Sequence, residues 1–254
     1  MLNNLLYWWW VFNSFLPGKI TINSPEKAAV ILTYFNRERI VHARYMVRLL
    51  LRCNFIDQII AANHNPALDI FQWIDIKNTR LKLINNDIKR GPGFRWITAN
   101  TLDSEYYLVI DDDFLIFPKQ LAILFTHLVE EPGIPHGLTG KQGIDGIYCR
   151  NMNTEVDILH QIFAVTGTHI NKFMEISNAV RLHQPDIYPL IEETTDDIVI
   201  SMTGKYKPRI HDVGFNLRCR TARKKGVALH QEESFLAKRL VMKKALENIR
   251  SLNK

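Results

Sequence analysis

The chain has 254 residues, of which 46% are apolar and 23% charged, as in ordinary globular proteins. Disordered and fibrous proteins are therefore excluded. The net charge of +6 is uneven, because the segment from Lys205 to the end holds 14 Lys and Arg against 4 acidic residues, whereas the rest sums to −4. We therefore expect an anionic partner near the C-terminal fifth of the chain, and no binding of nucleic acid by the whole protein.

Residues 5–16 read LLYWWWVFNSFL. This apolar run is too short to span a bilayer, and no basic residue before Lys19 supports a signal peptide, so a cytoplasmic location is expected. On a helix one face would hold Leu5, Trp8, Trp9, Phe12, Phe15 and Leu16. Two interpretations remain open for this face: packing against the protein's own domain, or peripheral membrane contact through residues 5–16.

The first half of the chain alternates strand-like and helix-like segments. The expected strands are 28–33, 58–62, 81–84 and 106–110, and the expected helices lie between about 37 and 52 and over 94–102. This alternation predicts a single α/β domain with a three-layer architecture and a mostly parallel central sheet. Ligands of such sheets bind beyond the carboxyl ends of the strands.

The second half is expected to continue the same domain. We predict helices over 118–130, 195–202 and 231–252, and strands over 136–141 and 156–165. The resulting division is an apolar extension over 1–27, a main domain over 28–230 and a basic C-terminal helix over 231–254. The three cysteines, Cys53, Cys149 and Cys219, are widely spaced and lack C-x-x-C pairing, so we expect buried, reduced thiols.

Three consecutive acids, Asp111, Asp112 and Asp113, end the apolar strand YYLVI. Their repulsion in a partly desolvated cleft is costly unless a cation is present. Carboxylate oxygens favour Mn²⁺ or Mg²⁺, ions that commonly bridge protein acids to phosphate oxygens. A solvated acidic loop is the alternative, but the position at a strand end favours a metal site.

Several segments together resemble nucleotide-sugar-dependent glycosyltransferases of the GT-A fold. The most similar type is the exostosin-like one (glycosyltransferase family 64), or a bacterial-type relative of it. The resemblance rests on AVILTYFNRE at 29–38, Asn63 and Asn65, NNDIKRGPGFRW at 85–96, LVIDDDFLI at 108–116 and TTDDIVISM at 194–202. It implies a GT-A (Rossmann-like) fold and transfer of a hexosyl or N-acetylhexosaminyl group from a nucleotide diphosphate donor, expected to be a UDP-sugar, onto a carbohydrate or lipid-linked acceptor of polysaccharide biosynthesis.

The resemblance also implies roles for individual residues. Nucleotide-sugar contacts would come from Thr33, Tyr34, Arg37, Asn63, Arg90, Arg95, Asp111 and Asp112. The D-x-D pair would place Asp113 and Asp111 on Mn²⁺ or Mg²⁺, with His230 as a late metal ligand and His211 as a weaker candidate. The late acids Asp196 and Asp197 would lie at the reacting sugar or acceptor hydroxyl, with Asp197 as the main catalytic residue. Helix capping is the other role open to this pair.

The sequence departs from the exostosin-like pattern at Thr195, where that family has a cysteine, so its disulfide is not expected. Retention of the anomeric configuration is implied by the family. A non-catalytic nucleotide-sugar or carbohydrate-binding protein of the same fold remains the alternative. A haloacid-dehalogenase-type phosphatase is disfavoured because Leu115 stands where that motif needs a threonine. A nucleic-acid-binding module on the basic tail lacks interleaved aromatic residues.

Overall fold

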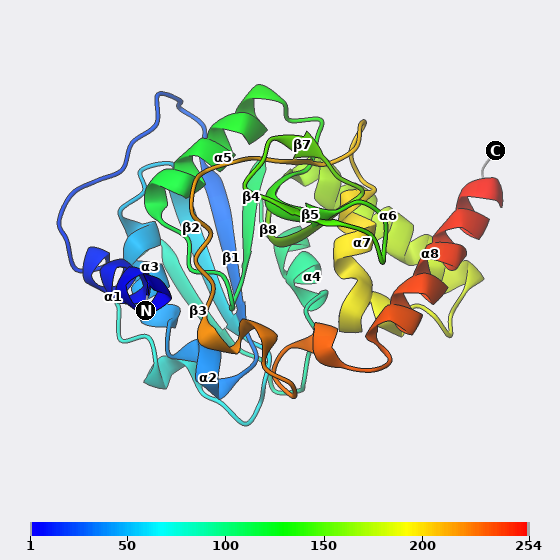
Figure 1. Ribbon diagram of the computed structural model, residues 1–254, viewed down its shortest axis with the longest axis horizontal. Helices are drawn as coiled ribbons and strands as arrows, with labels where there is room; N and C mark the ends of the chain where they lie inside the picture. Colours follow the sequence, from blue (N-terminus) through cyan, green and yellow to red (C-terminus); the bar gives the residue numbers. More distant parts are fainter. Residues whose placement is uncertain (1, 253–254) are drawn as a thin grey trace.

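The structure, a computed structural model, describes residues 2–252, and the side chains of 4–250. One mixed sheet runs through the molecule in the order β3-β2-β1-β4-β8-β5-β9-β7, with β6 paired to β5 (Figure 1). The strands are β1 (Ala28–Tyr34), β2 (Ile56–Asn63), β3 (Leu81–Asn85), β4 (Tyr106–Asp111), β5 (His136–Lys141), β6 (Tyr148–Arg150), β7 (Thr154–Glu155), β8 (Ile158–Thr166) and β9 (Arg209–Ile210). Strands β3, β2, β1 and β4 are parallel, whereas β8 runs antiparallel to both β4 and β5.

Helices cover both faces of this sheet. The α-helices are α1 (Leu2–Asn13), α2 (Arg37–Ile40), α3 (Ala43–Leu51), α4 (Phe94–Asn100), α5 (Pro118–Glu130), α6 (Gly167–His183), α7 (Asp196–Ser201) and α8 (Phe235–Leu252). Short helical turns lie at Ile70–Gln72, Ile191–Thr195, Arg220–Arg223 and Leu229–Gln231. Helices α1, α3 and α5 share one hydrophobic cluster with the sheet, and α4, α6, α7 and α8 share the other.

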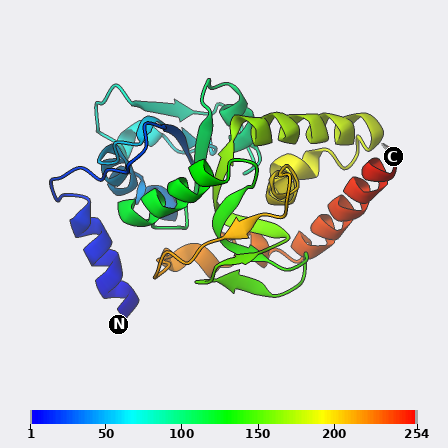
Figure 2. The same cartoon turned by 90° about the horizontal axis from the view of Figure 1, so that it is seen from above.

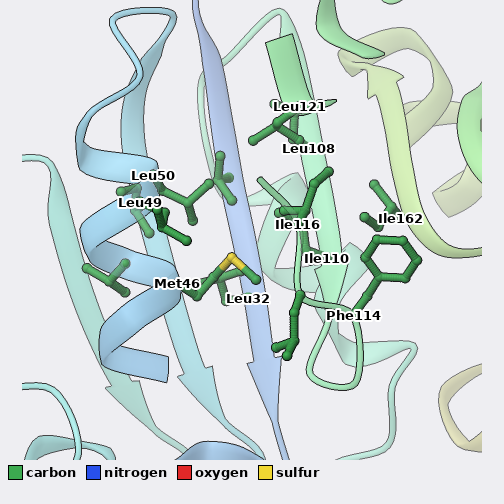
Figure 3. Close-up of a cluster of buried hydrophobic side chains, with 14 of the residues drawn as sticks. Leu32, Met46, Leu49, Leu50, Leu108, Ile110, Phe114, Ile116, Leu121 and Ile162 are labelled. Carbon is green, nitrogen blue, oxygen red and sulfur yellow. The ribbon is translucent and has the colours of Figure 1, made fainter. Parts of the chain in front are cut away.

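The alternation of side chains along the central strands separates these two cores. In β1, Val30 and Leu32 enter the cluster with α3 and α5, while Ile31 enters the cluster with α4 and α6. In β4, Leu108 and Val109 divide in the same way. A strand with helices on both faces must be apolar at successive positions, which is why these segments read as continuous hydrophobic runs. Figure 3 shows part of the first core, where side chains of α3 meet those of β1 and β4.

The predicted α/β class with a central sheet between helices is confirmed, and the expected strands and helices occur within a few residues of their predicted ends. Helix α6 was not expected. Its buried face combines His169, Ile170, Phe173, Ser177 and Val180, so polar residues interrupt the apolar stripe that would have marked the helix. The three cysteines are free and buried, as predicted.

Helix α1 packs by a different face from the one that its aromatic residues suggested. Trp10 is fully buried, and its Nε1 donates to the Ile116 carbonyl at 2.9 Å. The Arg52 guanidinium donates to the Asn13 carbonyl at 2.6 Å and fixes the end of the helix. The face with Trp8 and its aromatic neighbours is exposed instead. Figure 2 shows α1 projecting at one end of the molecule, with α8 at the other. Within residues 2–252 no helix is long and apolar enough to cross a membrane.

Candidate active site

The carboxyl ends of the four parallel strands form one edge of the sheet, as expected. Tyr34, Asn63 and Asn85 end β1, β2 and β3 in register, and Thr33 of β1 pairs with Asp111 at the end of β4. The chain turns immediately after Asp111. The acidic run therefore leaves the sheet at the position where α/β folds bind ligands.

Arg95 joins the first acid of this run to the late acidic pair. Its guanidinium contacts the Asp111 carboxylate on one side and lies 2.7 Å from Asp196 Oδ2 on the other. Trp96 Nε1 also donates to Asp196 Oδ2, at 2.7 Å. Arg95 and Asp196 are both almost fully buried. Arg95 thus holds β4 and the start of α7 together, and Asp196 has a structural role in this arrangement.

Glycines make this junction possible. A Cβ atom on Gly93 would lie 2.3 Å from the Ile191 carbonyl oxygen, and one on Gly91 would lie 2.2 Å from that of Glu192. Gly93 N donates to the Glu192 carbonyl at 2.9 Å. The glycine turn before α4 therefore packs backbone to backbone against the π-helical turn before α7, which brings Arg95 within reach of Asp196.

The other two acids of the run pair with arginines from distant segments. Arg39 of α2 donates to Asp112 Oδ1 at 2.6 Å, and Arg218 donates to Asp113 Oδ2 at 2.9 Å. Gln161 of β8 lies beside Asp113 and adopts a left-handed backbone with φ of 68°. Such a conformation in a residue other than glycine is a local strain of the kind found near functional sites.

Asp197 forms a second cluster with residues of β8 and α8. His160 Nδ1 lies 2.9 Å from Asp197 Oδ2, and Arg239 donates to Asp197 Oδ1 at 2.7 Å. His160 Nε2 is buried without a hydrogen-bond partner among the described residues. A hydrogen bond from Nδ1–H to an ionised Asp197 fixes the tautomer in which Nε2 carries a lone pair. Thr195 precedes α7 but makes no side-chain capping bond.

The two clusters differ in their electrostatics. Burial raises the pKa of Asp111 to about 7 against the effect of Arg95, with Asp113 and Asp196 adding to the rise. Burial also acts to raise the pKa of Asp197, but Arg239 and then His160 hold it well below its usual value. Asp197 is thus ionised at neutral pH. Asp111, in contrast, lies where negative side chains outnumber positive ones.

The excess of negative charge bears on whether the site suits a divalent metal ion. The five acids Asp111, Asp112, Asp113, Asp196 and Asp197 face four arginines, Arg39, Arg95, Arg218 and Arg239, which leaves one negative charge when His160 is neutral. Within the described part of the chain, no three His, Cys, Asp or Glu side chains are already arranged as a metal-binding group. The hard oxygen donors of Asp111 and Asp113, and the excess negative charge where Asp111 and Asp196 share Arg95, fit Mn²⁺ or Mg²⁺ if Arg218 releases Asp113.

The residues predicted to contact the nucleotide lie around the same edge, but they differ in how far they are buried. Thr33 is half-buried, Tyr34 is buried beneath Asp112, and Arg37 is exposed. Arg90 is half-exposed, 3.8 Å from Glu192. Asn63 is fully buried, and its amide donates to the Asn65 carbonyl at 2.9 Å and to two further acceptors in the adjoining loop. The side chain of Asn63 is thus engaged in holding the loop.

The two late histidines differ in position. His211 packs away from the acids, with its Nε2 2.8 Å from His136 Nδ1 and its ring stacked on His127. Burial lowers the pKa of His230, and the charges of Arg218 and Asp113 also act on this group, which places it on the Asp113 side of the site. His230 therefore remains a candidate ligand, while His211 belongs to a separate cluster.

Three residues of the site were not predicted from the sequence: Arg39, His160 and Arg239. Arg39 lies two residues after the predicted Arg37, on the turn of α2 that faces Asp112. His160 stands next to Gln161 in an otherwise mostly apolar strand, where polar residues were a possible signal. Arg239 lies on α8, 42 residues beyond Asp197, in a helix read only as basic and amphipathic.

No family profile and no curated protein sequence matches this chain. Solved structures with the same fold are found, however. A mannosyltransferase, PcManGT, from Pyrobaculum calidifontis in complex with GDP-Man and Mn²⁺ has a TM-score of 0.51 at 13% identity, over 95% of this chain and 71% of that one. GalNAc-T7 with UDP, GalNAc and Mn²⁺ has a TM-score of 0.51 at 10% identity, over 72% of this chain.

These similarities establish the class of fold, which is that of GT-A nucleotide-sugar glycosyltransferases. This chain spans only 41% of the length of the GalNAc-T7 chain. At these identities the likeness is one of fold.

Proposed function

We propose that the protein is a metal-dependent glycosyltransferase that moves a sugar from a nucleotide diphosphate, with a UDP-sugar favoured, to a carbohydrate or lipid-linked acceptor. The observation that carries the proposal is the convergence of Asp111, Asp113 and Asp197 at the carboxyl edge of the sheet, with one negative charge left unneutralised. The two structural neighbours, which hold UDP or GDP-Man together with Mn²⁺, support the same chemistry.

On the donor side, Asp111 and Asp113 would hold Mn²⁺ or Mg²⁺, with His230 nearby as a further ligand. When bound, the ion would neutralise negative charge that develops on the departing diphosphate. Arg218 pairs with Asp113 in this structure, and it would turn to the diphosphate when the cation takes its place. Thr33, Arg37 and Arg90 surround this edge and would contact the rest of the nucleotide.

On the acceptor side, Asp197 and His160 would work together. Asp197 would accept the Nδ1–H of His160 and so fix the tautomer in which Nε2 carries the lone pair, and Nε2 has no partner among the described residues. Nε2 would take the proton from the acceptor hydroxyl as that oxygen attacks the sugar. Arg239 keeps Asp197 ionised and in place. A base acting on the acceptor predicts inversion of the anomeric centre, in contrast to the retention that the exostosin-like resemblance implies.

The alternative is a protein that binds nucleotide-sugars without turning them over. Asp112 would then serve with the other acids only in binding, and the pair of Asp197 and His160 would have no chemical role.

We place the protein in the cytoplasm, where nucleotide-sugar donors are made, and at the membrane periphery through residues 5–16. No nucleic-acid partner is proposed.

The test measures binding and turnover separately. UDP and GDP are screened for an increase in Tm with and without Mn²⁺, and release of nucleotide from a panel of donor sugars is followed. We expect Asp113→Asn to lose the protection given by nucleotide with Mn²⁺. Asp197→Asn and His160→Gln are expected to keep that protection but to lose at least about 100-fold in turnover. Asp145→Asn, at an exposed loop acid, is the control.

Two outcomes would contradict the proposal. If Asp113→Asn binds nucleotide and Mn²⁺ as the wild type does, the metal assignment is wrong. If Asp197→Asn and His160→Gln turn over the donor at the rate of the control, the protein does not use this pair as a base. NMR of the product's anomeric proton decides between inversion and retention.

A further inference from the structure

Helix α1 presents an aromatic surface to solvent. Its outer face carries Leu5, Trp8, Trp9 and Phe12, and Phe15 follows in the turn after the helix; each is between 51% and 63% exposed. The helix cannot easily turn this face inward, because Trp10 is fully buried on the opposite side and bonded to the Ile116 carbonyl. Exposed clusters of large aromatic side chains are unusual on a soluble surface and mark sites of interaction.

The surroundings of this face are cationic. A cavity of about 880 Å³ lies between α1 and the basic segment 215–223, and Trp8 belongs both to its lining and to the aromatic face. Arg150, Arg220 and Arg223 line the cavity without a carboxylate partner among the described residues, and the single acid of the lining, Glu38, is paired with Lys224. Residues 2–16 contain no acid.

We propose that the outer face of α1 and the arginines of this cavity form a docking surface for an anionic lipid bilayer. Tryptophan and phenylalanine rings partition into the boundary between headgroups and acyl chains, while arginines beside them contact lipid phosphates. The position of α1 at one extremity of the molecule leaves this face free to meet a flat surface (Figure 2).

A second copy of the chain fits the same surface less well. In a two-fold dimer through α1 each copy would bring the same arginines to the interface, and these like charges would face each other. A bilayer with anionic headgroups supplies the opposite charge for the arginines and an apolar layer for the rings. The charge distribution therefore favours the lipid surface.

Docking in this orientation has a consequence for the proposed transfer reaction. Arg218 lines the cavity and also binds Asp113, so the bilayer would lie beside the carboxylate site. A lipid-linked acceptor is then favoured over a soluble carbohydrate. This consequence rests on the proposed function, whereas the docking itself does not.

The experiment measures partitioning of the full chain onto vesicles by cosedimentation. Vesicles of phosphatidylcholine alone are compared with equal mixtures of phosphatidylcholine and phosphatidylglycerol, at low and high salt. We expect the wild type to bind the anionic vesicles and to be released by salt. The double variant W8S/F12S should lower the partition coefficient by more than about tenfold, because two buried rings are lost.

The matched control for the aromatic face is L182S/Y206S, which removes two exposed apolar side chains from other parts of the surface. For the charges, R220Q/R223Q is expected to weaken binding to anionic vesicles by roughly 30-fold. Its control, K243Q/K244Q, removes two exposed lysines from α8 and should bind as the wild type does. Circular dichroism confirms that every variant is folded.

Three results would overturn the proposal. The first is absence of wild-type binding to anionic vesicles. The second is equal loss in W8S/F12S and in its control. The third is a dimer in sedimentation velocity that W8S/F12S dissociates, which would assign the face to a second copy. Because the assay contains no nucleotide or sugar, failure of transferase activity leaves this test unaffected, and failure of docking leaves the metal-site and turnover tests unaffected.

Discussion

Replacing Arg95 by alanine tests the central junction of the site. Arg95 is 3% exposed and is the cation between Asp111 and Asp196. Its removal leaves the Asp196 carboxylate buried with only Trp96 as a donor, and leaves Asp111, which retains some solvent contact, without its cation. Removing one partner from a buried ion pair costs about 3–5 kcal/mol. For a domain of this size, that cost corresponds to a decrease in Tm of about 6–20 °C.

The assay is urea and thermal unfolding followed by circular dichroism, with Arg90→Ala as the matched control. Arg90 lies in the segment just before α4, but it is half-exposed and 3.8 Å from its acid, so its loss should cost less than about 1 kcal/mol. The double variant R95A/D196N should be more stable than R95A, because the asparagine carries no charge and still accepts from Trp96.

The sign of the pH dependence follows from the same reasoning. Burial already raises the pKa of Asp196, and loss of Arg95 would raise it further. A carboxyl group whose pKa is raised by folding stabilises the folded state at low pH and loses that contribution as pH rises. The deficit of R95A relative to the wild type should therefore shrink between about pH 8 and pH 5. Equal stability of R95A and R90A, or no recovery in R95A/D196N, would refute the role assigned to Arg95.

Three further predictions concern other parts of the fold. In EDTA, the wild-type Tm should fall as pH rises through about 7, which is the pKa to which burial raises Asp111. Mn²⁺ should remove this slope. An identical slope in Asp111→Asn would contradict the assignment. Gly93→Ala should cost about 1–3 kcal/mol in urea unfolding, because its Cβ would clash with the Ile191 carbonyl, and a neutral result would refute that packing. Trp10→Ala should cost about 3–5 kcal/mol and increase proteolysis of α1, whereas Trp10→Phe, which loses the bond to Ile116, should cost about 1–2 kcal/mol.

The sheet and its acidic edge were predictable from the sequence because they depend on local patterns. The apolar runs at 28–33 and 106–110 predicted strands buried on both faces, and parallel strands of this kind expose their ends at one edge. The three acids that begin at Asp111 come immediately after one of those runs in the sequence. Neither inference required contacts between distant segments.

The tertiary structure decided which charged residues pair with each other. The sequence placed both Asp196 and Asp197 at the reacting sugar or acceptor, with Asp197 as the main catalytic residue, but successive residues of a helix point in different directions. Asp196 turns into the core toward Arg95, and Asp197 turns toward His160 and Arg239. Partners 37 and 42 residues away cannot be assigned by spacing alone.

The N-terminal segment shows most clearly which features depend on the sequence alone and which depend on the tertiary structure. The sequence by itself indicated an aromatic face, since on a helix the spacing places Trp8, Trp9 and Phe12 together, and the structure forms this helix over Leu2–Asn13. Both faces of the helix are rich in large apolar residues, so hydrophobicity did not decide which one packs inward. The tertiary structure did, because it buries Trp10 and supplies the Ile116 carbonyl as the acceptor for its ring nitrogen. The remaining aromatic face was left to solvent.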